Sequence, residues 1–521
     1  MDKTLSLAAK FYLDLAPPSL QDNTADLDRV VRQLKVLTGF ENFQIPFDRI
    51  PEWVKRLRAA RYRVTASLAL TPPWARLLDL EPGDTTEKCY GLAVDLGTTR
   101  IACQIWDLKR GEPVFETDFE NPQTPFGPDI LTRIHMAEKP EGLRTLQEAV
   151  IHELNRTIEE FSKSSSLAPE NVLALALAGN TTMIHLFLGL DPYSLRREPY
   201  LPVVNVLEPL SARELGLALH PGGPVYIFPN VGSYLGGDIL AGILYSRLHH
   251  QDSLSLLVDV GTNAEVVLGN SQWLLGCAGA AGPALEGGVA AMGMTAGPGA
   301  IEQVRIDPQT REVRFKQIGR GLPSGICGSG LIDLVAEMFL AGLIDIRGKF
   351  NRKIKTDRWV ESEGQPAYRL VPADQTRTGR PIVFTQIDLD ILLRSKAAMY
   401  TILTTLVQSV GHRLDEVEQF FIAGAFGNHI DPEKAITIGL LPDLPRERFI
   451  PVGNASLKGA AELLLDYRQQ EEIRRIAGTI TYLEMNVNQD FMNRFSAARF
   501  LPHTDLSLFP SVPRPRWHEN R

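Results

Sequence analysis

Two short segments of the sequence combine an aspartate, a glycine and a threonine in the same order. Val94–Thr99 reads Val-Asp-Leu-Gly-Thr-Thr and Val258–Asn263 reads Val-Asp-Val-Gly-Thr-Asn, each after an apolar, strand-like stretch. A glycine at a strand reversal lets backbone N–H groups approach a phosphate, and threonine hydroxyls add further donors. An aspartate just before such a turn can hold a magnesium ion, because hard cations take oxygen ligands.

The repeated pattern assigns a role to each residue of the two turns. We expect Asp95 and Asp259 to face a magnesium ion and to act in catalysis. The residues expected to contact phosphates are Gly97, Thr98, Thr99, Gly261, Thr262 and Asn263. A single motif of this kind is more often an ordinary hairpin turn. Two copies with the same spacing favour a duplicated subdomain with a cleft between the copies.

A third acidic residue lies between the two turns. The tripeptide Gly236-Gly237-Asp238 precedes an apolar, helix-like stretch over 239–245. The simpler interpretation makes Asp238 a helix cap. The functional interpretation places Asp238 in the cleft, close to a nucleotide and its metal, as a catalytic residue.

Two glycine-rich stretches follow in the second half of the chain. Residues 277–299 contain alanine, methionine and valine among the glycines, which makes them too apolar for a flexible linker. Their backbone is therefore expected to approach a ligand closely. A second turn precedes the apolar helix expected over 331–340, and its candidate anion-binding residues are Gly325, Gly328, Ser329 and Gly330.

The segment Phe420–Asn428 is an apolar strand that runs into small residues. Small residues at the carboxyl end of a strand leave room for a purine or a ribose. We expect Gly424, Ala425 and Asn428 to lie against an adenosine, together with the turn at 325–330. Close packing of a helix on the strand is the alternative. Enlarging Gly424 to valine is expected to block a nucleoside and to spare the fold.

The sulfur and imidazole side chains do not form a recognisable metal motif. The sequence contains four cysteines, Cys89, Cys103, Cys277 and Cys327. They are too few and too scattered for a disulfide framework, so we expect buried free thiols. No Cys-x-x-Cys or His-Glu-x-x-His pattern occurs, which argues against a structural zinc or a cysteine-ligated cluster within this chain. The histidines, His185 and the pair His249–His250 among them, are expected to be satisfied core or cap residues.

Composition excludes several classes of protein. The 521 residues carry 54 Lys and Arg against 62 Asp and Glu, a net charge of −8, which argues against a general nucleic-acid binder. No apolar run reaches the length of about 18 residues that a membrane-spanning helix needs. The first residues lack the regions of a signal peptide. We therefore expect a cytoplasmic protein without membrane contact.

The elements that must position these residues fall into two parts. Residues 1–88 read as a small α+β unit, with strands over 11–15 and 62–70, a helix over 26–37 capped from 22–24, and a helix over 51–60. From Tyr90 onward, strands and helices interleave, which favours an α/β architecture. Residues 502–521 are rich in proline and read as a tail on the surface.

The order of these motifs resembles the superfamily of acetate and sugar kinases, heat-shock 70 proteins and actin (ASKHA). More closely, the sequence resembles the reductive activators of corrinoid enzymes (RACE). The segments that carry the closer resemblance are Val94–Thr99, Ala178–Met183, Val258–Glu265, Cys277–Gly287 and Leu501–Leu506. The resemblance covers nearly all of residues 1–510.

The resemblance implies a fold and an activity. It implies an actin-like ATPase with two ribonuclease-H-like lobes over 89–510, preceded by a linker and small α+β middle domain over 1–88 and followed by a tail over 511–521. ATP and Mg²⁺ are the implied cofactors. The implied partner is a corrinoid protein, either a corrinoid iron–sulfur protein or the corrinoid subunit of a methyltransferase, whose cob(II)amide is reduced to cob(I)amide. The resemblance also allows a homodimer.

The sequence departs from that family in one respect. The iron–sulfur domain that supplies the electron, with its plant-type cysteine spacing, is not found among these residues. Either the chain is a fragment, or it is a homologue that takes its electron from another donor. Two other readings stay open at this point: a small-molecule kinase of the same superfamily, and a nucleotide-gated binding protein without turnover.

Overall fold

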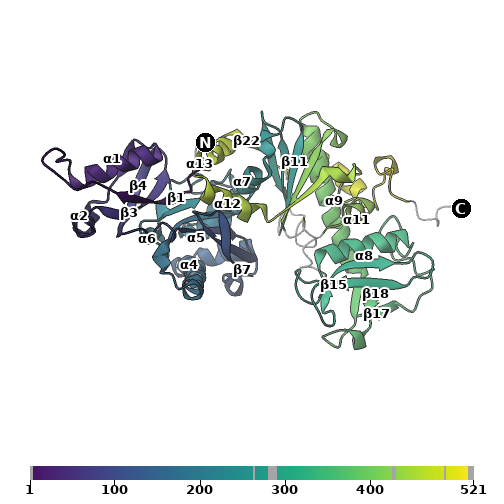
Figure 1. Ribbon diagram of the computed structural model, residues 1–521. Helices are drawn as coiled ribbons and strands as arrows, with labels where there is room; N and C mark the ends of the chain where they lie inside the picture. The colour runs from purple at the N-terminus through teal and green to yellow at the C-terminus, as the bar shows by residue number, and fades with distance from the viewer. Residues whose placement is uncertain are drawn as a thin grey trace. The chain divides into compact units, whose positions relative to one another are not determined.

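The computed structural model describes residues 4–261, 264–279, 290–424, 427, 430–485 and 489–513. The chain divides into two compact units (Figure 1). Unit 1 holds residues 1–245 and 455–479, and unit 2 holds residues 246–454 and 480–521. Four candidate site residues, Thr262, Asn263, Ala425 and Asn428, lie outside the described residues. Within the described ranges, no helix combines the length and the apolar character needed to cross a membrane.

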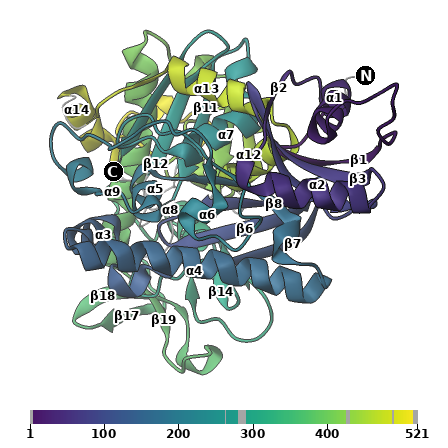
Figure 2. The ribbon, with the colours of Figure 1, turned by 90° about the vertical axis from the view of Figure 1, so that its left-hand side faces the viewer.

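The first part of unit 1 is the small α+β body expected from the sequence. Its four strands lie in the order β1 (Ala8–Asp14), β3 (Arg63–Thr71), β4 (Trp74–Pro82) and β2 (Asn42–Gln44). Two helices, α1 (Asp26–Thr38) and α2 (Ile50–Ala59), accompany this sheet (Figure 2). Leu34 of α1 and Trp53 and Leu57 of α2 are fully buried in the core that they share with the sheet.

The expected cap of α1 is wrong. Ala25 occupies the N-cap position, and no side chain caps the helix. The carboxylate of Asp22 instead accepts hydrogen bonds from the guanidinium groups of Arg29 and Arg32. Ion pairing to arginines one and two turns into the helix therefore competes successfully with capping for this side chain.

A six-stranded sheet forms the second part of unit 1. Its order is β7 (Glu112–Glu120), β6 (Arg100–Asp107), β5 (Tyr90–Leu96), β8 (Val172–Gly179), β10 (Pro224–Ile227) and β9 (Leu210–Ser211). The helices of this part are α3 (Ile130–Ala137), α4 (Pro140–Ser165), α5 (Thr181–Leu188), α6 (Ala212–Leu215) and α7 (Gly237–Ser246). Strand β8 is buried along its whole length, as a central parallel strand requires.

The central strand β5 shows different faces to α4 and to the late helix α12 (Ala455–Leu465). Leu92, Val94 and Leu96 belong to the core that contains the apolar residues of α4. The intervening residues point the other way, because side chains alternate along a strand. A Cβ added at Gly91 would meet Leu464 of α12 at 3.1 Å. Asp95 follows Gly91 by four residues and therefore points to the same face of the strand. Its side chain thus lies on the α12 face.

The main sheet of unit 2 has the same layout. Its order is β21 (Phe449–Gly453), β20 (Gln419–Ala423), β11 (Ser255–Val260), β12 (Ala264–Gly269), β13 (Leu274–Gly279) and β22 (Ile480–Tyr482). In both sheets three consecutive antiparallel strands are extended by two parallel strands on the side of the first, giving β7-β6-β5-β8-β10 and β13-β12-β11-β20-β21. The expected duplicated α/β fold is confirmed in strand order and direction.

Further elements of unit 2 are inserted between these strands. One three-stranded sheet has the order β15 (Val313–Gln317), β14 (Ala300–Ile306) and β16 (Gly325–Ile326). A second three-stranded sheet has the order β17 (Trp359–Ser362), β18 (Gln365–Val371) and β19 (Ile382–Thr385). The helices are α8 (Gly328–Leu340), α9 (Gln386–Ser409), α11 (Pro432–Thr437) and α14 (Gln489–Ala498), while α13 (Gln469–Thr479) belongs to unit 1. The fully buried Lys396 of α9 donates hydrogen bonds to the carbonyls of Phe500 and Pro502 and so holds the last described segment.

Candidate functional site

The first glycine–threonine turn follows β5 in unit 1. Asp95 is half-buried and pairs with Ala102 of β6 and Ala178 of β8. A Cβ added at Gly97 would lie 2.5 Å from the carbonyl oxygen of Arg100, so the reversal requires glycine. A tight strand reversal therefore explains the glycine of this motif. The turn that it forms is the first of the two turns expected to bind phosphates.

Two asparagines that were not among the expected site residues hold this turn in place, although Asn180 lies in the segment Ala178–Met183 that carries the family resemblance. Asn121 is fully buried; its side-chain amide donates to the Gly97 carbonyl at 2.8 Å and its backbone N–H donates to the Thr99 carbonyl. Asn180 caps α5 by accepting a hydrogen bond from Met183, and its amide donates to the Thr98 hydroxyl at 3.0 Å. A helix-capping signal at 179–182 was available for Asn180, whereas no local pattern points to Asn121.

Asp238 lies with Asp95 near the carboxyl ends of parallel strands. It is the second residue of α7, and its carboxylate accepts the N–H of Ile239 at 2.8 Å. Loss of hydration, with a smaller contribution from the negative charge of Asp95, raises the pKa of Asp238 to about 7. A Cβ added at Gly236 would lie 2.5 Å from the Cα of Asn180, so glycine lets this loop rest on the end of β8. Unit 1 therefore brings Asp95, Thr98 and Asp238 together.

The donor set of this half-site suits a divalent cation. Asp95 and Asp238 supply carboxylate oxygens, and the hydroxyl of Ser456 in α12 donates to Asp95 Oδ1 at 2.8 Å. Oxygen ligands with at least one carboxylate are what Mg²⁺ selects. A cation here would offset the repulsion between Asp95 and Asp238, which is the smaller of the two influences that raise the pKa of Asp238. The residues present therefore fit the expected ion.

The second turn, in unit 2, places Asp259 against the end of β20. Asp259 is half-buried and pairs with Glu265 of β12 and Ala423 of β20. Gly424 follows with a φ of +79°, and a Cβ on it would lie 2.8 Å from Asp259 Oδ1 and 3.0 Å from the Val260 carbonyl oxygen. The structure therefore brings together Asp259, Gly261 at the end of β11, and Gly424.

The expectation that valine at position 424 would spare the fold is wrong. A left-handed φ strains any residue with a Cβ, and β-branched residues most of all. The added atoms would also meet Asp259 and a backbone carbonyl without any nucleoside present. Gly424 is needed for the local backbone as well as for any ligand.

The turn at 325–330 is packed on β14. The Ser329 hydroxyl donates to the Glu302 carbonyl at 3.1 Å, and Gly325, Gly328 and Gly330 are buried. A Cβ at Gly330 would lie 2.2 Å from the Ile301 carbonyl oxygen. Close packing of α8 on β14 thus accounts for Gly330, and the role of this turn in binding an anion stays a prediction.

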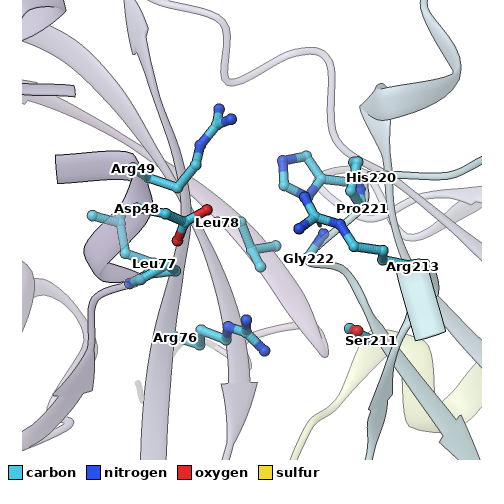
Figure 3. Close-up of a pocket in the computed structure, with 11 residues that line it drawn as sticks. Asp48, Arg49, Arg76, Leu77, Leu78, Ser211, Arg213, His220, Pro221 and Gly222 are labelled. Atoms are coloured by element: carbon cyan, nitrogen blue, oxygen red, sulfur yellow. Dashed lines mark hydrogen bonds between the residues drawn. The ribbon is translucent and has the colours of Figure 1, made fainter. Parts of the chain in front are cut away.

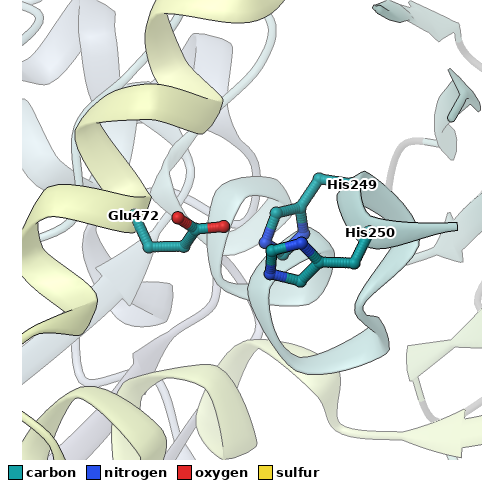
Figure 4. A group of neighbouring side chains, drawn as sticks. All are labelled: His249, His250 and Glu472. Carbon is teal, nitrogen blue, oxygen red and sulfur yellow. The ribbon is translucent and has the colours of Figure 1, made fainter. Parts of the chain in front are cut away.

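The cysteines and His185 match their expectations. All four cysteines are buried and free, and burial raises the pKa of the Cys89 thiol to about 12. Both ring nitrogens of the buried His185 are engaged, by the Thr181 carbonyl at 2.7 Å and the Val203 N–H at 2.9 Å. The rings of His249 and His250 lie against each other with centroids 4.1 Å apart (Figure 4).

Comparison with known proteins covers nearly the whole chain. The profile of the RACo linker region matches residues 4–87, that of the RACo middle region matches residues 90–251, and that of the C-terminal domain of RACo, the ASKHA domain, matches residues 253–513.

Individual relatives give the same picture. The corrinoid activation enzyme RamQ of Eubacterium limosum is 33% identical over 429 residues, which are 81% of this chain and 72% of RamQ. The [Co(II) methylated amine-specific corrinoid protein] reductase of Methanosarcina barkeri is 26% identical over 441 residues, 78% of this chain and 75% of the relative. A solved structure of a reductive activator for corrinoid, iron–sulfur protein superposes with a TM-score of 0.91 at 39% identity, over 98% of this chain and 81% of the other.

Proposed function

The chain belongs to the RACo family with its C-terminal ASKHA domain, and we propose that it is an ATP-dependent reductive activator of a corrinoid protein. In the proposed reaction one electron passes to the cobalt of cob(II)amide, which becomes cob(I)amide, while the donor is oxidised by one electron. The partner is a corrinoid iron–sulfur protein or the corrinoid subunit of a methyltransferase. The names of RamQ and of the two other relatives support this substrate class.

The observation that carries the nucleotide part of the proposal is the repeated strand end with its aspartate. Asp95 in β5 and Asp259 in β11 occupy equivalent positions, each next to the last residue of the strand that comes first along the chain in its sheet. Asp238 of α7 lies close enough to Asp95 for the charge of Asp95 to act on it. We assign Asp95 and Asp259 to Mg²⁺ and Asp238 to the catalytic group. When bound, the metal neutralises phosphate charge in the transition state.

The remaining contacts follow from the two turns and the glycine-rich segments. The phosphates are assigned to 97–99 and 261–263. The adenosine is assigned to Gly424, Ala425 and Asn428 with the turn at 325–330. Backbone N–H groups at such turns are fixed dipoles that stabilise negative charge without reorganisation.

The electron is proposed to come from an iron–sulfur donor other than the described part of this chain. A cluster needs about four ligands close in space, usually thiolates. Cys103 pairs with Val94 inside the first sheet, and Cys277 pairs with Val266 inside the second. These buried thiols pack inside the sheets and are not assigned to a cluster. The role proposed for this chain is therefore to bind ATP and the corrinoid partner. ATP can drive the step only by favouring one conformation of the complex over another.

The test is ATP-dependent formation of cob(I)amide on a corrinoid protein, with a low-potential iron–sulfur donor supplied. Wild type should form cob(I)amide only with Mg²⁺ and ATP. Asp95→Asn and Asp259→Asn should each lower the rate at least about a hundredfold, since each removes a carboxylate assigned to the magnesium ion. The exposed Asp84→Asn and Asp415→Asn are matched controls from the two units and should leave it within about twofold.

Two outcomes would contradict the proposal. Cob(I)amide formed at the same rate without ATP would remove the nucleotide from the reaction. Phosphorylation of a sugar or an acid by ATP, with no cob(I)amide formed, would make the protein a small-molecule kinase of the same superfamily.

A further inference from the structure

A cavity of about 130 Å³ lies in unit 1, away from the two aspartate turns (Figure 3). One wall comes from the region 4–87, through the short helix at 47–49 and strand β4, and the other from the region 90–251, through β9, α6 and the loop at 220–222. The polar residues that line it are Asp48, Arg49, Arg76, Ser211, Arg213 and His220. Two parts of the chain with separate sheets thus share one polar cavity.

Two of its guanidinium groups lack a close ion pair within the part of the chain that the structure describes. Among the described residues, Arg76 and Arg213 form no ion pair within 4.0 Å, although both side chains line the cavity. Figure 3 shows Arg76 on the β4 wall and Arg213 on the wall opposite. Arg49 differs, because its guanidinium lies 3.5 Å from Glu52 and 4.0 Å from Asp79. The positive charge available to a ligand therefore comes mainly from Arg76 and Arg213.

His220 adds an oriented neutral donor. The N–H of Gly222 donates to His220 Nδ1 at 3.2 Å, so the ring carries its proton on Nε2. Burial, the largest influence, lowers the pKa of His220 and keeps the ring neutral at pH 7. The Nε2–H is then left as a donor that can serve an acceptor within the cavity.

Two acidic groups lie near the cavity, and hydrogen bonds from Ser211 together with the charge of Arg76 lower the pKa of one of them, Glu214. Glu214 accepts hydrogen bonds from the N–H and the hydroxyl of Ser211 at 2.7 and 2.6 Å, which commits its carboxylate to the cap of α6. Asp48 is exposed and is the one carboxylate among the lining residues. Leu77 and Leu78 form a buried apolar part of the lining, which reduces hydration of an ion bound there.

We propose that this cavity binds a small phosphate-type oxyanion, held between Arg76 and Arg213 with His220 Nε2–H as a further donor. Arginine matches such oxygens because its planar fork gives two parallel hydrogen bonds. Typical cavities for drug-sized ligands measure about 300–1,000 Å³. A cavity of about 130 Å³ instead suits inorganic phosphate or the phosphate group of a small monoester. Because its walls come from two regions, the bound ion would also fasten the region 4–87 to the region 90–251.

The test is calorimetric titration of the full chain with inorganic phosphate at constant ionic strength. Wild type should show one saturable phosphate-binding site, and substitution of the cavity arginines should weaken binding at that site. Arg76→Gln and Arg213→Gln should each weaken binding about tenfold or more, since each removes a charge-assisted contact. Arg76→Lys keeps the positive charge but loses the planar guanidinium. Its affinity for phosphate should therefore lie between the affinities of wild type and Arg76→Gln. The matched control is Arg63→Gln, an exposed arginine of β3 outside the cavity, which should bind as wild type does.

Two further measurements identify the kind of ligand and test whether its binding stabilises the protein. Glycerol phosphate binding as tightly as phosphate would identify a monoester, and weaker binding would identify the free ion; either outcome supports the site. Phosphate should raise the thermal midpoint of wild type and Arg63→Gln but not of Arg76→Gln. Binding of equal strength in wild type, Arg76→Gln and Arg213→Gln, or no saturable binding at millimolar phosphate, would overturn the proposal.

Discussion

Ser456 donates a hydrogen bond of 2.8 Å to the carboxylate of Asp95, 361 residues earlier in the chain. Ser456 is buried near the start of α12, and α12 packs on β5 and β8 of the first sheet. A helix encoded after five of the six strands of the second sheet thus contributes to the surroundings of the first aspartate. The bond fixes the position of one oxygen of the Asp95 carboxylate.

Ser456→Ala should raise the Mg²⁺ concentration needed for half-maximal ATPase activity about tenfold. A hydrogen bond to a charged group contributes about 1.5–3 kcal/mol, and its loss here frees Asp95 to rotate away from the ion. The matched control is Ser67→Ala, which removes a buried serine–carboxylate bond to Glu81 in the same unit. If both variants lose activity in parallel with no change in Mg²⁺ dependence, Ser456 has only a structural role.

Gly424→Ala should lower the free energy of unfolding of unit 2 by about 2–3 kcal/mol, and Gly411→Ala by about 1 kcal/mol. Both glycines have a φ of +79°, so both substitutions pay the same left-handed strain of about 1–2 kcal/mol. Only at Gly424 would the new Cβ also meet Asp259 and Val260, whereas nothing lies within 4 Å at Gly411. Urea unfolding measures the difference, and equal losses would mean that the contact with Asp259 relaxes without cost.

Local patterns predicted most of the elements, because their signals lie within a few residues. The helix expected over 26–37 is Asp26–Thr38, and the strand expected over 62–70 is Arg63–Thr71. The doubled Asp-x-Gly-Thr motif also predicted the doubled sheet, since each copy ends the first strand of its sheet. The cap of α1 failed for a physical reason: Asp22 pairs with arginines that lie on the helix beyond its first turn.

Contacts between distant segments could not be read from the sequence. Ser456 and Asn121 reach the first turn from far along the chain, and neither belongs to a motif. The contact that an added Cβ at Gly424 would make with Asp259 depends on the position of Asp259 on the neighbouring strand, which the pairing of β11 with β20 determines. Side-chain identity shows what a residue can do, whereas the fold decides which residues it meets.

The purified chain should be colourless and unable to reduce a corrinoid protein by itself, even with ATP. Its four cysteines are buried, free thiols, and burial raises the pKa of Cys89, Cys103 and Cys277. A thiol held protonated is a poor iron ligand. ATP binding, measured by calorimetry, should persist because none of the assigned contacts is a cysteine. Stoichiometric iron and sulfide after anaerobic reconstitution, lost on Cys→Ala substitution, would contradict this expectation.

The contribution of Asp333 to the free energy of unfolding should fall as the pH rises from about 4 to about 6, and Asp333→Asn should remove that fall. Asp333 of α8 is buried, and loss of hydration, the largest influence, raises its pKa to about 6 from an ordinary 3.8. Between these values the unfolded chain releases the proton first, so ionisation favours unfolding by about 2–3 kcal/mol in all. Asparagine keeps an oxygen for the Val304 N–H, which lies 3.2 Å from Asp333, and carries no charge.

The measurement is urea unfolding at several pH values between 4 and 7. At pH 7 Asp333→Asn should be more stable than wild type, and the difference between their midpoints should grow from pH 4 to pH 7. Asp307→Asn is the control, because hydrogen bonds from the backbone N–H groups of Thr310 and Gln309 lower the pKa of that exposed aspartate, so it titrates below this window. A pH dependence identical in wild type and Asp333→Asn would show that Asp333 is ionised in the folded state throughout. In that case Lys434, whose charge acts on the same carboxyl and favours its ionised form, would outweigh the loss of hydration.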